Sequence, residues 1–72
     1  MSVLKKFGLR VRQLRETRGW SQEDFAEKAD LHRTYVSGIE RGTRNPTLTV
    51  LERIAGGFGM PIDQLLEGLS KK

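Results

Sequence analysis

The sequence contains no cysteine and only one histidine among its 72 residues. Without cysteine there is no disulfide framework and no thiolate metal site, which suits a reducing compartment and predicts a cytoplasmic protein. A lone histidine without a second ligand nearby argues against a metal site. No apolar run has the length of a membrane span or a signal-peptide core, so neither is expected. We therefore expect no metal, no cofactor and no membrane contact.

The chain is also too short for two ordinary domains. We expect one domain over residues 1–72. Hydrophobic residues make up 36% and charged residues 31% of the sequence, a composition that folds but stays well solvated. A domain of this size buries only about 60% of its unfolded surface, so its core is small and dimerisation would add stability.

The charges are unevenly distributed. Thirteen lysine and arginine residues against nine aspartate and glutamate residues give a net charge of +4. Basic residues dominate 1–20 and 33–45, whereas 21–32 are acidic. A basic balance in a small domain favours an anionic partner, nucleic acid above all. Whether the two basic segments meet on one face is not decided by the sequence.

Glycine and proline divide the chain into segments with helical periodicity. No segment alternates apolar and polar residues with a period of two, so no strand is expected. Apolar residues recur instead at steps of three and four, which predicts an all-α fold. The predicted helices span residues 3–18, 22–29, 32–41, 47–58 and 61–68.

Helix starts are marked by capping residues. Ser21 is placed as an N-cap, with Asp24 three residues later as the acidic partner of a capping box. Trp20 and Phe25 flank this start at the spacing of a hydrophobic staple. Thr47 is a good N-cap for the fourth helix.

Glycine and proline mark other helix ends. Gly19 and Gly42 are placed to end the first and third helices in the left-handed conformation. Gly56 and Gly57 each cost about 1 kcal/mol relative to alanine in a helix, which predicts a soft end for the fourth helix. Pro61 suits the first position of the fifth helix.

The second and third predicted helices are joined by a tight turn at residues 30–31, as in a helix-turn-helix. The outer face of the third helix is polar, basic and free of acids. It comprises Arg33, Thr34, Ser37, Gly38 and Arg41. Gly38 is unusual inside a helix, and the sequence allows either close approach of the helix backbone to DNA or neutral drift.

Three stretches together resemble the lambda-repressor-like, or XRE-type, helix-turn-helix family. They are residues 20–29 (Trp-Ser-Gln-Glu-Asp-Phe-Ala-Glu-Lys-Ala), 31–42 (Leu-His-Arg-Thr-Tyr-Val-Ser-Gly-Ile-Glu-Arg-Gly) and 44–48 (Arg-Asn-Pro-Thr-Leu). The resemblance covers roughly residues 7–67 and implies a compact five-helix domain that binds double-stranded operator DNA as a homodimer. The small size is similar to the controller proteins of restriction–modification systems, and phage repressors are also similar.

The resemblance implies roles for single residues. The N-terminal part of a recognition helix reaches base edges, which makes Arg33, Thr34 and Ser37 candidates for base contact. Arginine can bond O6 and N7 of guanine together; the alternatives are a phosphate contact or a solvated side chain. Candidates for phosphate or backbone contact are Gln22, His32, Tyr35, Arg41, Arg44 and Asn45. For Tyr35 a purely structural role is the alternative, and for His32 a helix-capping role.

Two further expectations concern structure and assembly. Arg15 and Glu40 match a family pair that links the first helix to the recognition helix. A dimer contact is predicted at Phe58, Met60, Ile62, Leu65, Leu66 and Leu69, with completion of the monomer core as the alternative.

No catalytic constellation is evident, because the carboxylates are scattered and the histidine is alone. We expect no enzyme and no small-molecule substrate. The leading interpretation is a transcriptional regulator, repressor or activator, on a palindromic operator. The alternatives are an antitoxin-like regulator that also binds a toxin protein, and a protein-interaction module without specific DNA binding.

Overall fold

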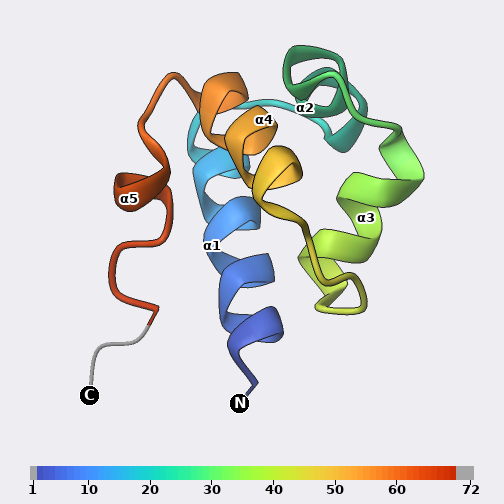
Figure 1. Ribbon diagram of the computed structural model, residues 1–72. Coiled ribbons are helices and arrows are strands. Elements are labelled where there is room, and N and C mark those ends of the chain that lie inside the picture. The colour runs from blue at the N-terminus through green and yellow to red at the C-terminus, as the bar shows by residue number, and fades with distance from the viewer. Residues whose placement is uncertain (1, 70–72) are drawn as a thin grey trace.

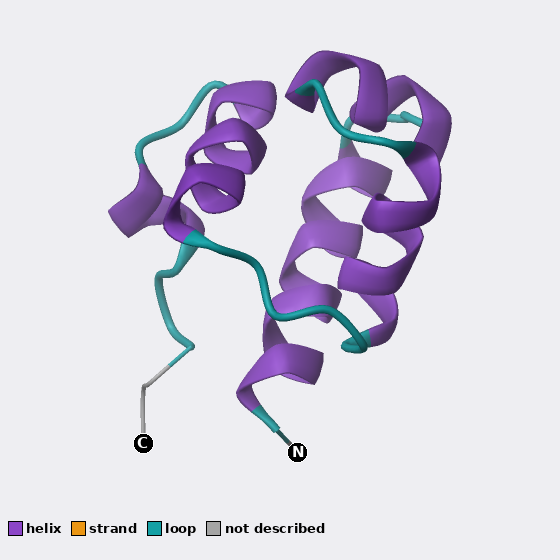
Figure 2. Cartoon of the chain, turned by 45° about the vertical axis from the view of Figure 1, so that its right-hand side comes forward, coloured by secondary structure: helices purple, strands orange, loops and turns teal. Residues whose placement is uncertain are grey.

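The computed structural model describes residues 2–69, and this part of the chain is helical and contains no strand. Five helices follow one another in the order α1 (Val3–Thr17), α2 (Gln22–Ala29), α3 (Arg33–Arg41), α4 (Leu48–Phe58) and α5 (Ile62–Leu65). Figure 1 shows the long α1 between α5 on one side and α3 on the other. The loop from α3 to α4 crosses the molecule in Figure 2. The all-α, five-helix prediction is confirmed.

The predicted helix starts are confirmed in detail. Ser21 accepts a hydrogen bond from the Asp24 amide, and the Asp24 carboxylate accepts one from the Ser21 amide at 2.9 Å. The hydrogen bond from the Ser21 amide favours the ionised carboxylate and holds the pKa of Asp24 below its ordinary value. Thr47 caps α4 by accepting from the Val50 amide at 3.2 Å. Each start uses a side-chain oxygen on an otherwise unpaired amide.

The helix ends differ from the prediction mainly in α5. It covers Ile62–Leu65 rather than 61–68, and Pro61 is its N-cap rather than its first helical residue. After Leu65 the chain forms tight turns with three-residue hydrogen-bond spacing, and Gly68 has a φ of +85°. α5 is already capped at Leu66, and the left-handed conformation of Gly68 excludes a right-handed helix that runs through residue 68.

The other ends agree within a residue. Gly19 and Gly42 have φ values of +72° and +76°, as expected for left-handed residues beyond helices. His32 and Thr47 are N-caps of α3 and α4 rather than their first residues.

The core lies where α1, α2, α3 and α4 meet. Its largest fully buried side chains include Phe25, Ile39 and Ile54. The rings of Phe25 and Phe58 stack with centroids 4.1 Å apart, and Trp20 stacks on Phe25 at 6.3 Å, which confirms the staple. This aromatic stack joins α4 to the start of the α2–α3 unit.

A close helix crossing holds α3 against α1. A Cβ atom built at Gly8 would lie 2.5 Å from the carbonyl oxygens of Ile39 and Glu40. No side chain larger than hydrogen fits there, so glycine lets the two backbones approach directly. The crossing fixes the C-terminal half of α3 on the scaffold.

The two adjacent glycines of α4 are expected to respond oppositely to alanine. A Cβ at Gly57 would lie 2.9 Å from Cε1 of Phe25 and 3.2 Å from Cα of Ala29, whereas a Cβ at Gly56 meets nothing within 4 Å. Gly57→Ala should therefore lower the free energy of unfolding by about 1–3 kcal/mol through overpacking. Gly56→Ala should raise it by up to about 1 kcal/mol through helix propensity. Urea unfolding of both variants checks this, and equal stabilisation by both would contradict the close packing of α4 on α2.

Candidate nucleic-acid interface

The α2–α3 unit has the geometry of a helix-turn-helix. α2 ends at Asp30, which adopts a φ of +56°, and the Leu31 amide donates to the Ala26 carbonyl at 2.8 Å. His32 then caps α3, because its Nδ1 accepts from the Thr34 amide at 3.2 Å. The helix-capping role of His32 is thus confirmed. The turn aims the N-terminal end of α3 outward.

The outward face of α3 presents the polar side chains that the sequence predicted. Arg33, Thr34 and Arg41 are exposed and Ser37 is half-buried. Nη1 of Arg41 donates to Oγ of Ser37 at 2.6 Å, which ties two of these residues together along the helix. The face is two helical turns long and carries a guanidinium group at each end.

The acids of α2 border this face at one end. A shallow cleft at the junction of α2 and α3 is lined by Glu23, Glu27, His32 and Arg33, with apolar residues beneath. The carboxylates of Glu23 and Glu27 make this side of the cleft unfavourable for phosphate groups. Arg33 lies at this boundary.

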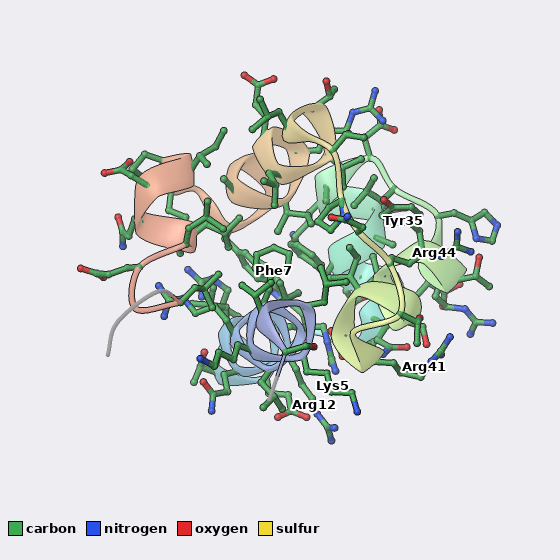
Figure 3. All side chains as sticks on the ribbon, turned by 60° about the horizontal axis from the view of Figure 1, so that its bottom comes forward. Lys5, Phe7, Arg12, Tyr35, Arg41 and Arg44 are labelled. Carbon is green, nitrogen blue, oxygen red and sulfur yellow. The ribbon has the colours of Figure 1, made fainter. Side chains whose placement is uncertain are left out.

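The loop after α3 folds back over the helix. The guanidinium carbon of Arg44 lies 5.3 Å from the centroid of the Tyr35 ring, and Figure 3 shows both side chains at the same edge of the molecule. Thr43 donates to the Gly38 carbonyl through its amide at 2.9 Å and through its hydroxyl at 3.1 Å. Gly38 is buried. Its backbone is therefore covered by this loop. Of the two explanations that the sequence left open for Gly38, close approach of the helix backbone to DNA does not fit this covering.

The predicted pair of Arg15 and Glu40 is confirmed. Nε and Nη2 of Arg15 donate to the two carboxylate oxygens of Glu40 at 2.7 and 3.0 Å. Nη1 of Arg15 donates to the Trp20 carbonyl at 2.8 Å. The hydrogen bond to Glu40 raises the pKa of Arg15. The pair joins α1, the start of α2 and the C-terminal half of α3.

Gln22 belongs to the same network. Its Nε2 donates to Oε1 of Glu40 at 3.1 Å, and its side chain is half-buried at the first position of α2. One Nε2 hydrogen is used in this bond, and the amide has a second. The predicted phosphate contact of Gln22 remains a prediction. Its side chain is held in place by the hydrogen bond to Glu40.

All four arginines of the N-terminal basic segment donate side-chain hydrogen bonds within the domain. Arg10 donates to the Gln64 and Leu65 carbonyls at 2.8 and 3.1 Å, and Arg18 donates to the Phe58 carbonyl at 3.2 Å. Both satisfy carbonyl groups at helix C-termini, where a positive charge is favoured. These two guanidinium groups of the N-terminal basic segment are thus engaged at the ends of α5 and α4.

Lys5 is a candidate for contact with nucleic acid that the sequence did not single out. A Cβ at Gly42 would lie 3.0 Å from the Lys5 Cα, so the first turn of α1 packs against the end of α3. Figure 3 shows Lys5 and Arg41 on the same side of the molecule. Only the tertiary crossing brings them together, and no local sequence signal could have indicated it.

The predicted dimer residues separate into two groups. Phe58 and Leu65 are 5% and 0% exposed in the monomer, so their assignment to a dimer surface is wrong. Phe58 fills the aromatic stack, and Leu65 is the one buried side chain of the short α5. The other four, half-buried beside the core, stay predicted contacts: Met60, Ile62, Leu66 and Leu69.

Asn45 is exposed in the loop between α3 and α4.

None of the helices described is both long and apolar enough to cross a bilayer.

Comparison with known proteins agrees with this architecture. The helix-turn-helix family matches residues 11–65. Control protein C.BamHI of Bacillus amyloliquefaciens is 48% identical over 62 residues, which are 85% of this chain and 76% of that protein.

Two solved structures are similar throughout. The restriction-modification controller protein C.AhdI from Aeromonas hydrophila superposes with a TM-score of 0.83 at 42% identity, covering 86% of this chain and 94% of that one. The controller protein C.Esp1396I, solved as a tetramer with its natural 35 base-pair operator, gives 0.85 at 39% identity, covering 96% and 91%. This chain therefore belongs to the helix-turn-helix family, and control proteins of restriction–modification systems are among the members that it resembles.

Proposed function

We propose that this protein is a sequence-specific DNA-binding transcriptional regulator that acts as a homodimer on a two-fold symmetric operator, as a control protein of a restriction–modification system. The observation that carries the proposal is the outward face of α3, where Arg33 and Arg41 flank Thr34 and Ser37 on the second helix of a helix-turn-helix. A similar controller protein was solved on its operator.

The face suits the major groove. The N-terminal residues of a recognition helix reach base edges, and Arg33 is the first residue of α3. Its guanidinium would donate to O6 and N7 of guanine, while Thr34 and Ser37 would contact neighbouring bases. These three residues would supply sequence preference.

Phosphate contacts would position the helix. Gln22 begins α2, where the helix dipole and unpaired amides favour an anion. The other proposed contacts are His32, Tyr35, Arg41, Arg44 and Asn45. Such contacts add affinity and orientation but carry no sequence information directly.

A homodimer would place two copies of α3 about 34 Å apart, one turn of DNA, and so require a palindromic site. A contact between copies is supported by four half-buried apolar residues in the C-terminal part of the chain. They occur in the α4–α5 connection, in α5 and after it: Met60, Ile62, Leu66 and Leu69. The proposed activity is binding, without catalysis or a small-molecule substrate, and it places the protein in the cytoplasm with the DNA.

Selection from a random duplex library at fixed, near-physiological salt tests the proposal. We expect an enriched site with two-fold symmetry. Lys6→Ala is the charge control, because Lys6 lines a groove beside residues 67–69 rather than the α3 face, and it should enrich the same site. Uniform weak binding to all sequences would contradict specific regulation and point to a protein partner instead.

A further inference from the structure

We propose that Gly38 is a positioning residue for DNA binding: its missing side chain makes the space in which Arg44 crosses α3 and joins the recognition face. The inference rests on the proposed function, because it assigns how one of the DNA-contacting side chains is held. Gly38 contacts no partner itself, since the loop after α3 covers it.

Gly38 is not required by its backbone conformation. The glycines with positive φ are Gly19, Gly42, Gly59 and Gly68, and Gly38 is an ordinary helical residue. Glycine is a poor helix former at such a position. Its presence therefore calls for a spatial reason.

The space beside Gly38 is filled by the side chain of Arg44. A Cβ atom at position 38 would lie 2.7 Å from Cγ and 3.2 Å from Nε of Arg44, and 3.3 Å from Oγ1 of Thr43. The first of these distances is too short for two carbon atoms. Alanine at position 38 would thus displace Arg44, whose side chain is exposed and free to rotate.

Two interactions hold Arg44 in its present position, one through its own side chain and one through the preceding residue of the loop. Its guanidinium lies over the ring of Tyr35, which is half-buried and packs against the core. Such a cation–π contact orients a flexible arginine at modest strength. The two hydrogen bonds from Thr43 to the Gly38 carbonyl fix the start of the loop.

This placement of Arg44 extends the outward face of α3, which carries Arg33, Thr34, Ser37 and Arg41. Gly38 follows Thr34 by four residues, so the two lie one above the other on the same side of α3. The Arg44 side chain crosses α3 at Gly38, on the side of the helix that bears Thr34. By this inference its guanidinium group acts together with those of Arg33 and Arg41. An arginine there faces the same DNA as α3, although it belongs to a loop.

Gly38→Ala tests the inference, because stability and DNA affinity should change in different directions. A purely structural role of Gly38 would lower both. The variant should keep its thermal midpoint or gain a few degrees, because alanine favours the helix. Its affinity for the selected duplex should nevertheless fall about tenfold, as one arginine contact per subunit is weakened. Gly56→Ala, the same change at an open helical site, should bind like the wild type.

A double-mutant cycle identifies Arg44 as the intermediary. Arg44→Ala should lose at least as much affinity as Gly38→Ala, and adding Gly38→Ala to it should cause no further loss. Additive losses would overturn the inference. So would wild-type binding by Gly38→Ala, or unfolding of that variant, which would mean that the Cβ atom displaces the helix rather than the arginine.

Nuclear magnetic resonance without DNA separates this inference from the proposed function. Tyr35 is the only tyrosine, so its ring protons are readily identified. Their chemical shifts should change in Arg44→Ala and change similarly in Gly38→Ala, while Gly56→Ala leaves them unaltered. Unchanged shifts in Gly38→Ala would overturn the placement of Arg44. A failure of the duplex selection, by contrast, would overturn the proposed function.

Discussion

Replacing Glu40 with alanine is expected to lower the free energy of unfolding by about 2–4 kcal/mol, because it leaves a part-buried guanidinium without its counter-ion. The side chains of Arg15 and Glu40 are only 11% and 5% exposed, and two hydrogen bonds join them. Gln22 also loses its acceptor. Native proteins have a total stability of about 5–15 kcal/mol, so a loss of this size is a large fraction of the total.

Equilibrium urea unfolding measures this loss, and the chain contains a matched control. Arg12 and Glu16 form an ion pair of similar length, 3.0 Å, but their side chains are 58% and 53% exposed. Glu16→Ala should therefore cost less than about 0.5 kcal/mol. If Glu40→Ala and Glu16→Ala were equally mild, the buried pair would not be a structural link between α1 and α3.

The double replacement Arg15→Met with Glu40→Leu distinguishes a missing partner from a missing attraction. Removing both charges avoids an unpaired buried ion, so the double variant should be more stable than Glu40→Ala. The gain is limited, because the Trp20 carbonyl loses its donor from Arg15.

Replacing Arg33 with alanine is expected to weaken binding to the selected operator by at least about 30-fold for a dimer. A bidentate arginine–guanine contact contributes about 1–3 kcal/mol of discrimination, and two subunits double it. Arg33 is exposed at the first position of α3, so its removal should leave the stability within about 0.5 kcal/mol. Titration with the selected duplex and with variants at each position measures both affinity and preference.

Arg33→Lys keeps the charge but loses the fork of donors. It should retain binding to DNA of mixed sequence and lose preference at one position in each half-site. If Arg33→Ala instead weakened binding to every sequence equally, Arg33 would be a phosphate contact and base recognition would lie with Thr34 and Ser37.

Local chemistry explains why the helices were predictable from the sequence. Ser21 with Asp24, and Thr47 at the start of α4, bond amides within three residues of themselves. Gly19 and Gly42 close helices through their own φ angles. Such signals need no distant partner, which is why the starts of α1, α2 and α4 and the turn before α3 agree with the structure within about a residue.

The candidate site was predictable where it lies on one helix and unpredictable where two elements meet. The spacing of Arg33, Thr34, Ser37 and Arg41 places them on one face of α3 by helical periodicity alone. The position of Arg44 over Tyr35, and of Lys5 beside the end of α3, depends on how a loop and another helix pack there.

The helices, their caps, the helix-turn-helix and the polar, basic face of α3 could thus be read from the sequence, because each follows from interactions or spacings within a short stretch of chain. Tertiary structure alone decided which charges remain for a partner and which apolar residues face outward. It placed Arg10 and Arg18 on helix carbonyls and buried Phe58 and Leu65. It also explains Gly38, because only the folded structure shows that the Arg44 side chain fills the space beside this helical glycine.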